Sequence, residues 1–158
     1  MKKLFVVFLV LSFFIVSFSL NVGALGGMEL GGRERVYLGG RVTMLGFPLG
    51  LSGDIYLPMA SFDDASDELT EVRFLEVDPY LLLSLKLGNT YIYGGGAPIF
   101  IFDIEQTGFS FYNGWAKLKA GLQFGSFLIF FVEGTSSINF DFELSGIYSV
   151  HAGIGIGF

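Results

Sequence analysis

The chain ends on a strictly alternating segment, YSVHAGIGIGF, at residues 148–158. Every second residue from Tyr148 to Phe158 is apolar, and the residues between them are glycine, serine or histidine. Because successive side chains of a β-strand point to opposite faces, a period of two predicts a strand with one apolar face and one small, polar face. The strand therefore includes the last residues of the sequence.

The same alternation recurs upstream and predicts eight strands in total. It is clear in the segments NVGALGGMEL, VYLGGRVTM, LGLSGDIYL, VDPYLLLSLKL and GWAKLKAGLQF. Two further segments, TYIYGGGAPIFIF and FLIFFV, have the composition of strands, but their pattern leaves their faces unassigned. No window sustains apolar residues at helical spacing, and the 23 glycines disfavour helices. We expect an all-β protein.

The predicted connections are alternately short and long. Short turns are predicted at 46–48, 88–89 and 125–126. Longer, polar connections are predicted at 31–35, 58–71, 103–109 and 133–146. If the strands run up and down, all the short turns lie at one end of the assembly. An even number of strands of about ten residues, with short turns on one side and longer loops on the other, is typical of a transmembrane β-barrel.

The N-terminus has the pattern of a secretory signal. Lys2 and Lys3 precede the apolar run LFVVFLVLSFFIVSFSL, which ends in small residues around Phe18. We therefore expect a signal peptide at 1–19, cleaved after Ser19, and a barrel domain at 20–158. An uncleaved anchor is the alternative, because the 17-residue run is at the short end of a membrane span. The absence of cysteine excludes disulfides, a zinc–thiolate site and a lipid anchor on cysteine.

The C-terminal segment resembles the recognition signal of bacterial outer-membrane barrels, in which a polar residue, a glycine, a hydrophobic residue and a final aromatic residue follow at fixed spacing. His151, Gly153, Ile156 and Phe158 occupy these positions. Over 21–158 the chain is similar to the small eight-stranded outer-membrane proteins. The resemblance implies an eight-stranded, antiparallel, up-and-down transmembrane β-barrel in the cell outer membrane, with outer-membrane lipid and the barrel-assembly machinery as partners. The family spans anchors, adhesion and resistance proteins, carriers of small apolar molecules and lipid-modifying enzymes, so the resemblance assigns no activity.

The charged residues fall into two groups. Eleven of the 15 acidic residues lie in the predicted long connections, and so acidic a surface disfavours nucleic-acid binding. The charged residues on strands lie opposite the apolar face, which places them inside the barrel. The predicted lumen charge network is Glu29, Arg41, Asp54, Glu76, Asp78, Lys86, Lys117, Lys119 and His151. Because side chains just fill an eight-stranded barrel, we expect a filled lumen; a proton or ion path is the alternative.

The register of one hairpin predicts an ion pair inside the barrel. A four-residue connection at 46–49 sets Arg41 directly opposite Asp54 and Thr43 opposite Ser52. Buried ions need partners because their desolvation is costly, so this pair is expected to help close the lumen.

No residues form a recognisable catalytic or metal motif, and we expect no catalytic residue, cofactor or metal site. His151 is the only histidine, and Ser149 lies too far along the strand to form a good hydrogen bond with it. The acidic segment DDASDELTE at 63–71 lacks the ligand spacing of a calcium loop. A solvated loop is the expectation there; divalent cations bridging lipid phosphates, or a surface partner, are the alternatives.

The expected function is a structural or surface-interaction role for a non-porin outer-membrane barrel, carried by the long acidic loops. One alternative is a carrier of small apolar molecules across the outer membrane, using the apolar tip INFDFEL at 138–144. A second is a lipid-modifying barrel enzyme that uses His151. A third is a soluble exported barrel with an interior ligand, which the C-terminal motif disfavours.

Overall fold

The computed structural model describes residues 19–31, 35–59 and 74–158. The predicted signal peptide lies outside these residues except for Ser19, and most of the predicted connection at 58–71 lies outside them too. The strands are β1 (Ser19–Leu30), β2 (Val36–Leu45), β3 (Leu49–Met59), β4 (Phe74–Leu87), β5 (Thr90–Asp103), β6 (Gly108–Gly125), β7 (Leu128–Asn139) and β8 (Leu144–Gly157). No helix in the three described ranges is long and apolar enough to cross a membrane.

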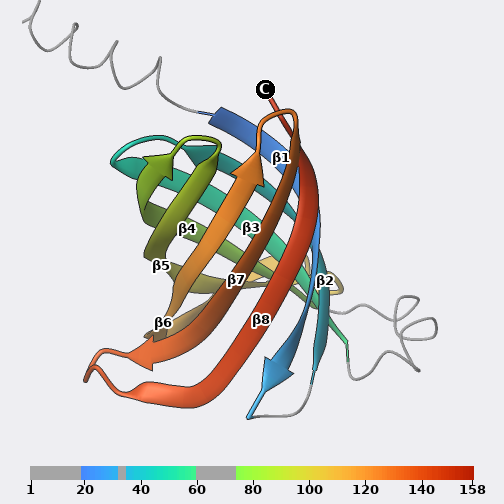
Figure 1. Cartoon of the computed structure of the whole chain (residues 1–158). Helices are drawn as coiled ribbons and strands as arrows, with labels where there is room; N and C mark the ends of the chain where they lie inside the picture. The colour runs from blue at the N-terminus through green and yellow to red at the C-terminus, as the bar shows by residue number, and fades with distance from the viewer. Residues whose placement is uncertain (1–18, 32–34, 60–73) are drawn as a thin grey trace, which may run out of the picture.

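The eight strands close into a barrel (Figure 1). Each strand pairs antiparallel with its neighbours in sequence, and β8 pairs with β1 to complete the ring. The predicted all-β, eight-stranded, up-and-down antiparallel barrel is confirmed. Closure leaves no unpaired strand edge along the wall.

The short turns and the C-terminus lie at one end of the barrel, at the top of Figure 1. The turns occupy 46–48, 88–89 and 126–127, so only the last is displaced from its prediction, by one residue. The hairpin of β2 and β3 has the predicted register, with Arg41 opposite Asp54. Hairpin geometry is local, which is why the sequence pattern was sufficient to predict it.

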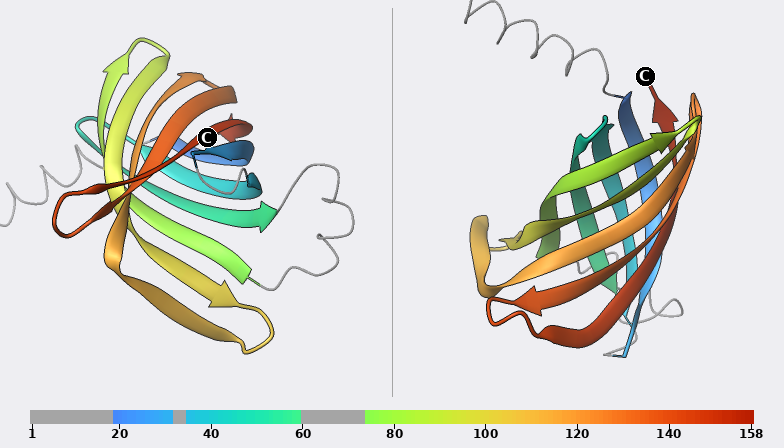
Figure 2. Two further views of the ribbon diagram at one scale, coloured as in Figure 1. Left: turned by 90° about the horizontal axis from the view of Figure 1, so that it is seen from below. Right: turned by 60° about the vertical axis from the view of Figure 1, so that its left-hand side comes forward.

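Two of the predicted long connections are wrong. The β5–β6 connection is 104–107 and the β7–β8 connection is 140–143, instead of 103–109 and 133–146. In the second hairpin β7 continues through polar residues such as Thr135, because polar side chains are tolerated where they face the lumen. Figure 2 shows these two hairpins splaying outward at the loop end of the barrel.

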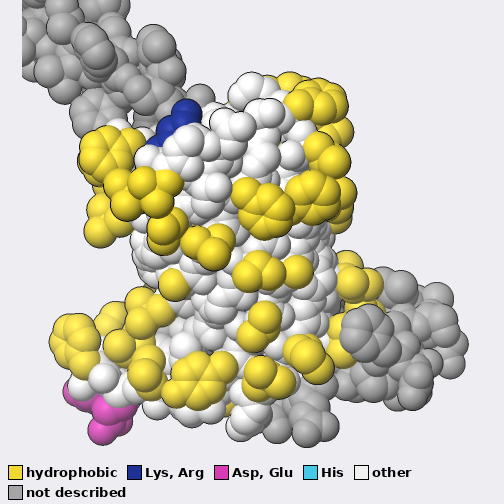
Figure 3. All heavy atoms as spheres, viewed as in Figure 1, with side chains coloured by type: hydrophobic (Ala, Val, Ile, Leu, Met, Phe, Trp, Pro, Cys, Tyr) yellow, Lys and Arg dark blue, Asp and Glu magenta, His cyan; other side chains and the backbone are white. Residues whose placement is uncertain are grey.

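Every strand exposes apolar side chains on the outer wall. The exposed fraction of these side chains is 43% to 67% in one example from each strand. In order from β1 to β8 the examples are Val22, Val42, Leu51, Leu83, Ile92, Leu122, Val132 and Ile154. On the face in Figure 3, hydrophobic side chains spread over the wall and the charged ones lie near its ends. An apolar surface this continuous is typical of one that contacts lipid or another protein.

The inward face carries the packed core. Odd-numbered residues face the lumen in β5 and β7, the two strands whose faces the sequence left unassigned. At the turn end the core cluster consists of Leu45, Tyr80, Leu82, Tyr91, Tyr93 and Ala97. A second cluster, closer to the loop end, consists of Leu25, Tyr37, Tyr56 and Phe131. The lumen is therefore filled by side chains, as expected for eight strands.

Candidate functional site

A buried network of ion pairs crosses the middle of the lumen, with Asp54 at its centre. Arg41 donates to both carboxylate oxygens of Asp54, from Nε at 2.9 Å and from Nη2 at 2.7 Å. Lys119 of β6 forms a second ion pair with this carboxylate. The hydroxyls of Ser52 and Tyr56 donate to it at 2.6 Å and 2.8 Å. Asp54 is completely buried, so these donors replace the water that its charge loses on folding.

Glu133 completes the central network and corrects the sequence prediction, which placed it in a loop. It lies on β7, 2% exposed, and forms ion pairs with both Arg41 and Lys119, the latter at 3.2 Å. The hydroxyl of Tyr93 also donates to it, at 2.8 Å. Because β7 continues past Val132, its inward odd positions extend to Glu133. The signal was present in the sequence as the alternating inward series Ile129, Phe131, Glu133, Thr135.

Aromatic side chains pack against both cations of this central network. The guanidinium of Arg41 lies 4.1 Å from the ring centre of Phe131, and the ammonium of Lys119 lies 3.8 Å from that of Tyr80. A Cβ added at Gly121 would come within 2.8 Å of the Tyr93 hydroxyl, so glycine there leaves room for the aromatic ring. Two cations face two carboxylates in a packed interior, and together they block the lumen.

A second charged cluster lies nearer the loop end. Lys117 forms ion pairs with Glu76 and with Asp78, the latter at 3.1 Å. The hydroxyl of Tyr80 donates to Asp78 at 3.2 Å. Glu29 lies across the lumen and accepts a hydrogen bond from the Tyr37 hydroxyl at 2.8 Å. The four charged residues of this cluster, Glu29, Glu76, Asp78 and Lys117, were predicted from strand parity to face inward, and the structure places them there.

Lys86 does not join the network, contrary to the prediction. It is exposed, with its ammonium 5.4 Å from the ring centre of Tyr91. Position 86 has the inward parity but lies one residue before the end of β4. At the barrel rim a long lysine side chain reaches water, so parity there does not imply burial.

His151 faces the lumen as predicted, but its neighbours are mainly aromatic. Its ring centre lies 5.6 Å from that of Tyr37 and 5.1 Å from that of Tyr56. Its Nε2 lies 3.4 Å from the hydroxyl of Thr135, and the residue is 1% exposed. The side chain is thus out of reach of lipid.

The other residues of the predicted assembly signal lie on both faces of β8. Gly153 faces the lumen, where an added Cβ would meet the ring of Phe131. Ile156 and Phe158 face outward and are 44% and 78% exposed. The structure thus shows an aromatic side chain at the turn-side rim; its role in assembly stays a prediction.

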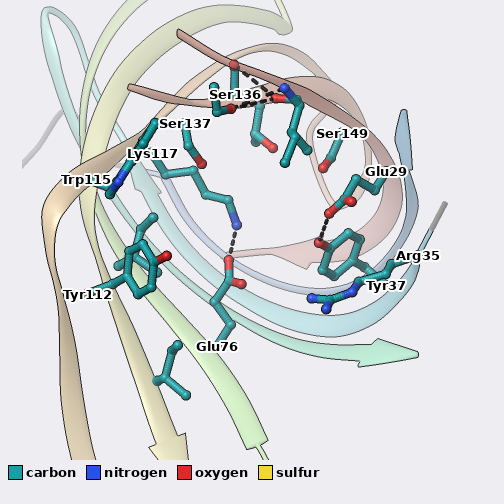
Figure 4. A pocket seen from close by; sticks show the side chains of 15 residues that line it. Glu29, Arg35, Tyr37, Glu76, Tyr112, Trp115, Lys117, Ser136, Ser137 and Ser149 are labelled. Atoms are coloured by element: carbon teal, nitrogen blue, oxygen red, sulfur yellow. Dashed lines mark hydrogen bonds and ion pairs between the residues drawn. The ribbon is translucent and has the colours of Figure 1, made fainter. Parts of the chain in front are cut away.

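A cavity of about 480 Å³ opens at the loop end of the lumen, where Lys117 and Glu76 are among its lining residues (Figure 4). We call it the loop-side cup. Its charged lining residues are Glu29, Arg35, Glu76 and Lys117. Hydroxyl groups come from Tyr37, Tyr112, Thr135, Ser136, Ser137, Ser145 and Ser149. The central ion pairs around Asp54 and Glu133 block the lumen on the turn side of the cup, so the cup opens only at the loop end.

A large bulge in β6 brings two aromatic residues to the cup. Pro98 pairs with Ala116 and Phe100 pairs with Phe111, so one residue of β5 faces four residues of β6. The bulge holds Gly114 at φ +91°, a conformation that side chains with a Cβ rarely adopt. Bulges re-aim side chains. Here the bulge turns Tyr112 and Trp115 towards the cavity.

A second bulge lies in β8 and also borders the loop-side cup. Ser136 pairs with Tyr148 and Ile138 pairs with Leu144, so one residue of β7 faces three of β8. Gly146 within it has φ +73°. Ser145 and Ile147, on either side of this glycine, both line the cup. Sequence reasoning missed both bulges, although an Asn-Gly pair at 113–114 and a Ser-Gly pair at 145–146 were signals for irregular backbone there.

The described residues contain no group of three or more histidine, cysteine, aspartate or glutamate side chains placed to bind a metal ion. The acidic segment at 63–71, the predicted alternative site for divalent cations or a surface partner, lies outside the described residues.

Comparisons with known proteins show the fold. No protein-family model and no curated protein sequence matches the chain. The N-terminal β-barrel domain of Pseudomonas aeruginosa OprF is similar with a TM-score of 0.58 and 14% identity, over 89% of this chain and 97% of that one. A de novo designed transmembrane β-barrel has a TM-score of 0.58 and 14% identity, over 89% and 95%. Neisserial surface protein A (NspA) has a TM-score of 0.51 and 7% identity, again over 89% and 95%. At these identities the likeness concerns the fold alone, and this chain has the fold of small eight-stranded membrane barrels.

Proposed function

We propose that this chain is an outer-membrane β-barrel with a structural or surface-interaction role, and that it does not act as a porin. The observation that carries the proposal is a closed barrel with an apolar outer wall around a lumen blocked by buried ion pairs. In hydrocarbon every backbone polar group must be paired within the protein, which a closed barrel achieves. Strands of 10 to 18 residues are long enough to cross, because about 9–11 tilted residues suffice.

The loop end supplies the surface for interactions. Asn139 organises the β7–β8 turn, where its side-chain oxygen accepts hydrogen bonds from the backbone N–H groups of Asp141 at 3.0 Å and Glu143 at 2.8 Å. This turn presents Phe142, which is 86% exposed, between the two acids. Among the described residues, the part of this surface role that was predicted for 103–109 and 133–146 falls to the shorter connections 104–107 and 140–143 of the splayed hairpins.

The two alternative functions gain less support. A carrier of small apolar molecules needs an apolar pocket, whereas the loop-side cup holds four charged side chains, Glu29, Arg35, Glu76 and Lys117, beside apolar lining residues such as Ile99 and Ile101. A lipid-modifying enzyme that uses His151 needs this side chain to reach lipid, whereas it lies buried between two tyrosine rings.

The location and orientation are testable by cysteine labelling, because the chain has no cysteine of its own. With Asp141→Cys at the β7–β8 turn, a membrane-impermeant maleimide is expected to label intact cells. With Asn89→Cys at the opposite end, labelling is expected only after the outer membrane is permeabilised. The reverse pattern contradicts the orientation, and protein recovered mainly in soluble fractions contradicts the location.

Conductance tests the closed lumen. The wild-type barrel in a planar lipid bilayer is expected to show no stable, ohmic channel, because the central ion pairs and their aromatic neighbours occupy the cross-section. A known porin inserted under the same conditions is the positive control. Steady conductance from the purified barrel would mean that water passes the network and that the structural assignment is wrong.

A further inference from the structure

We propose that the loop-side cup is a binding site for a neutral saccharide. This inference deepens the proposed function, since the side of the membrane from which the sugar arrives depends on the proposed orientation. Binding itself does not depend on it and is measured on the purified barrel.

The charges of the cup favour a neutral ligand. Among the described residues that line the cup, Glu29 and Glu76 are balanced by Arg35 and Lys117. Glu76 is ion-paired with Lys117, and Glu29 accepts a hydrogen bond from Tyr37 at 2.8 Å. A charged ligand meets a group of its own sign on whichever wall it approaches, and pairing with Glu76 or Lys117 means displacing the existing partner. A neutral ligand avoids both penalties.

The unpaired polar groups of the cup match hydroxyl-rich chemistry. Among the described residues, Arg35, Ser137 and Ser149 have no hydrogen-bond or ion-pair partner for their side chains, and all three line the cavity. Figure 4 shows these side chains around the rim of the cup, with the two serine hydroxyls pointing inward. A serine hydroxyl both donates and accepts, whereas a guanidinium only donates. Sugar hydroxyls can satisfy all three, but an apolar ligand would bury them without partners.

The two aromatic residues of the β6 bulge supply the apolar part of the site. Trp115 and Tyr112 stand on the wall beside Lys117, and Tyr112 is 52% exposed. A sugar ring has an apolar face of C–H groups, which packs against aromatic rings, while Trp and Tyr keep a polar tip for hydrogen bonding. The cavity of about 480 Å³ lies within the usual range for small-molecule sites. The β8 bulge adds Ser145 and Ile147 to the lining, so both glycine-containing bulges contribute to the cup, and bulges are over-represented beside functional sites.

The chain's single tryptophan, Trp115, makes the cup directly observable. The full-length mature barrel is purified in a zwitterionic detergent without a sugar headgroup, and its tryptophan emission is titrated with glucose, maltose and lactose. At least one of these sugars is expected to give a saturable change by about 100 mM, where even millimolar affinities saturate. Sodium gluconate and glycine betaine, an anion and a zwitterion of similar size, are expected to give none. A response to betaine or gluconate alone, or to none of the sugars, overturns the proposal.

Variants then locate the binding. Ser137→Ala, Ser149→Ala and Arg35→Gln are each expected to weaken sugar binding about three- to tenfold, the change that one lost hydrogen bond produces. Asn89→Ala at the opposite end is the matched control and is expected to bind like the wild type. Circular dichroism confirms that each variant is folded, and calorimetry on Trp115→Phe checks that binding does not depend on the fluorescence signal. Equal binding by all the cup variants overturns the site.

The source of the sugar is decided by a competition. A short alkyl glucoside, below its micelle concentration, displaces the free sugar if the cup accepts glycolipid headgroups. Suppose instead that the glucoside binds, that the free sugars do not bind, and that the cup variants do not change the binding of the glucoside. The alkyl chain is then associating with the outer wall, and the proposal fails. Sugar binding by a barrel that proves not to lie in the outer membrane contradicts only the proposed function.

Discussion

Asp54→Ala is expected to lower the free energy of unfolding of the barrel by about 3–5 kcal/mol, the usual cost of leaving a buried charge unpaired. Asp54 is 0% exposed and carries ion pairs to both Arg41 and Lys119. Without it, two buried cations share Glu133 as their remaining carboxylate in the central network. The hydroxyls of Ser52 and Tyr56 also lose their acceptor. Reversible urea unfolding in lipid vesicles, followed by fluorescence, measures the loss.

The double variant separates the network from simple loss of packing. Arg41→Ala combined with Asp54→Ala removes one cation and one anion, and leaves Lys119 paired with Glu133 at 3.2 Å. The double variant is therefore expected to cost less than the sum of the two single variants, because residues in one network are coupled. Asp141→Ala, on an exposed turn, is the control and is expected to change stability by less than about 0.5 kcal/mol. Strictly additive losses would indicate a hydrated lumen in which the charges act independently.

Phe158→Asp is expected to abolish most assembly of the barrel in cells while leaving its secretion unchanged. The side chain is 78% exposed at the turn-side rim, so it contributes little packing within the barrel. Its backbone N–H donates to the carbonyl of Leu20 at 2.8 Å, a bond that the aspartate keeps. A defect would therefore arise in recognition by the assembly machinery rather than in the folded state. The measurement is the amount of folded, membrane-inserted protein in cell envelopes.

Two controls test that explanation. Phe127→Ala removes another exposed aromatic side chain, 69% exposed, at the same end of the barrel, and is expected to assemble normally. Purified Phe158→Asp, refolded from urea into detergent without any machinery, is expected to fold as the wild type does. Normal envelope levels of the aspartate variant would count against the assembly signal, and failed refolding in vitro would assign the defect to stability instead.

Strand parity was reliable for the fold because it is a local property. The alternation from Tyr148 to Phe158 is borne out by a β8 whose apolar residues face outward and whose His151 and Ser149 are buried. The same local rules predicted the register of Arg41 with Asp54. Parity assigns a face, however, and not a depth along the barrel. For this reason Lys86 was placed in the lumen, although it lies at the open rim.

The network around Asp54 shows where local rules end. The strand-like segment FLIFFV ends at Val132, so the sequence pattern places Glu133 in a connection and not in the lumen network. The contact of Glu133 with Arg41 joins residues 92 apart in sequence, and the contact of Lys119 with Asp54 joins residues 65 apart. No pattern within one hairpin encodes such pairs. They form only when closure of the ring brings β2, β3, β6 and β7 to face one another across a lumen narrow enough for side chains to meet.

The sequence by itself determined the all-β class, the eight strands, the short turns and the faces of six strands, because each follows from periodicity or turn chemistry within about ten residues. Only the tertiary structure decided which inward charges meet and where the lumen is blocked. It also decided that the bulges at Gly114 and Gly146 shape a cup between strands distant in sequence. The physical reason is that side-chain contacts across a barrel depend on closure and stagger of the whole sheet, which no single strand specifies.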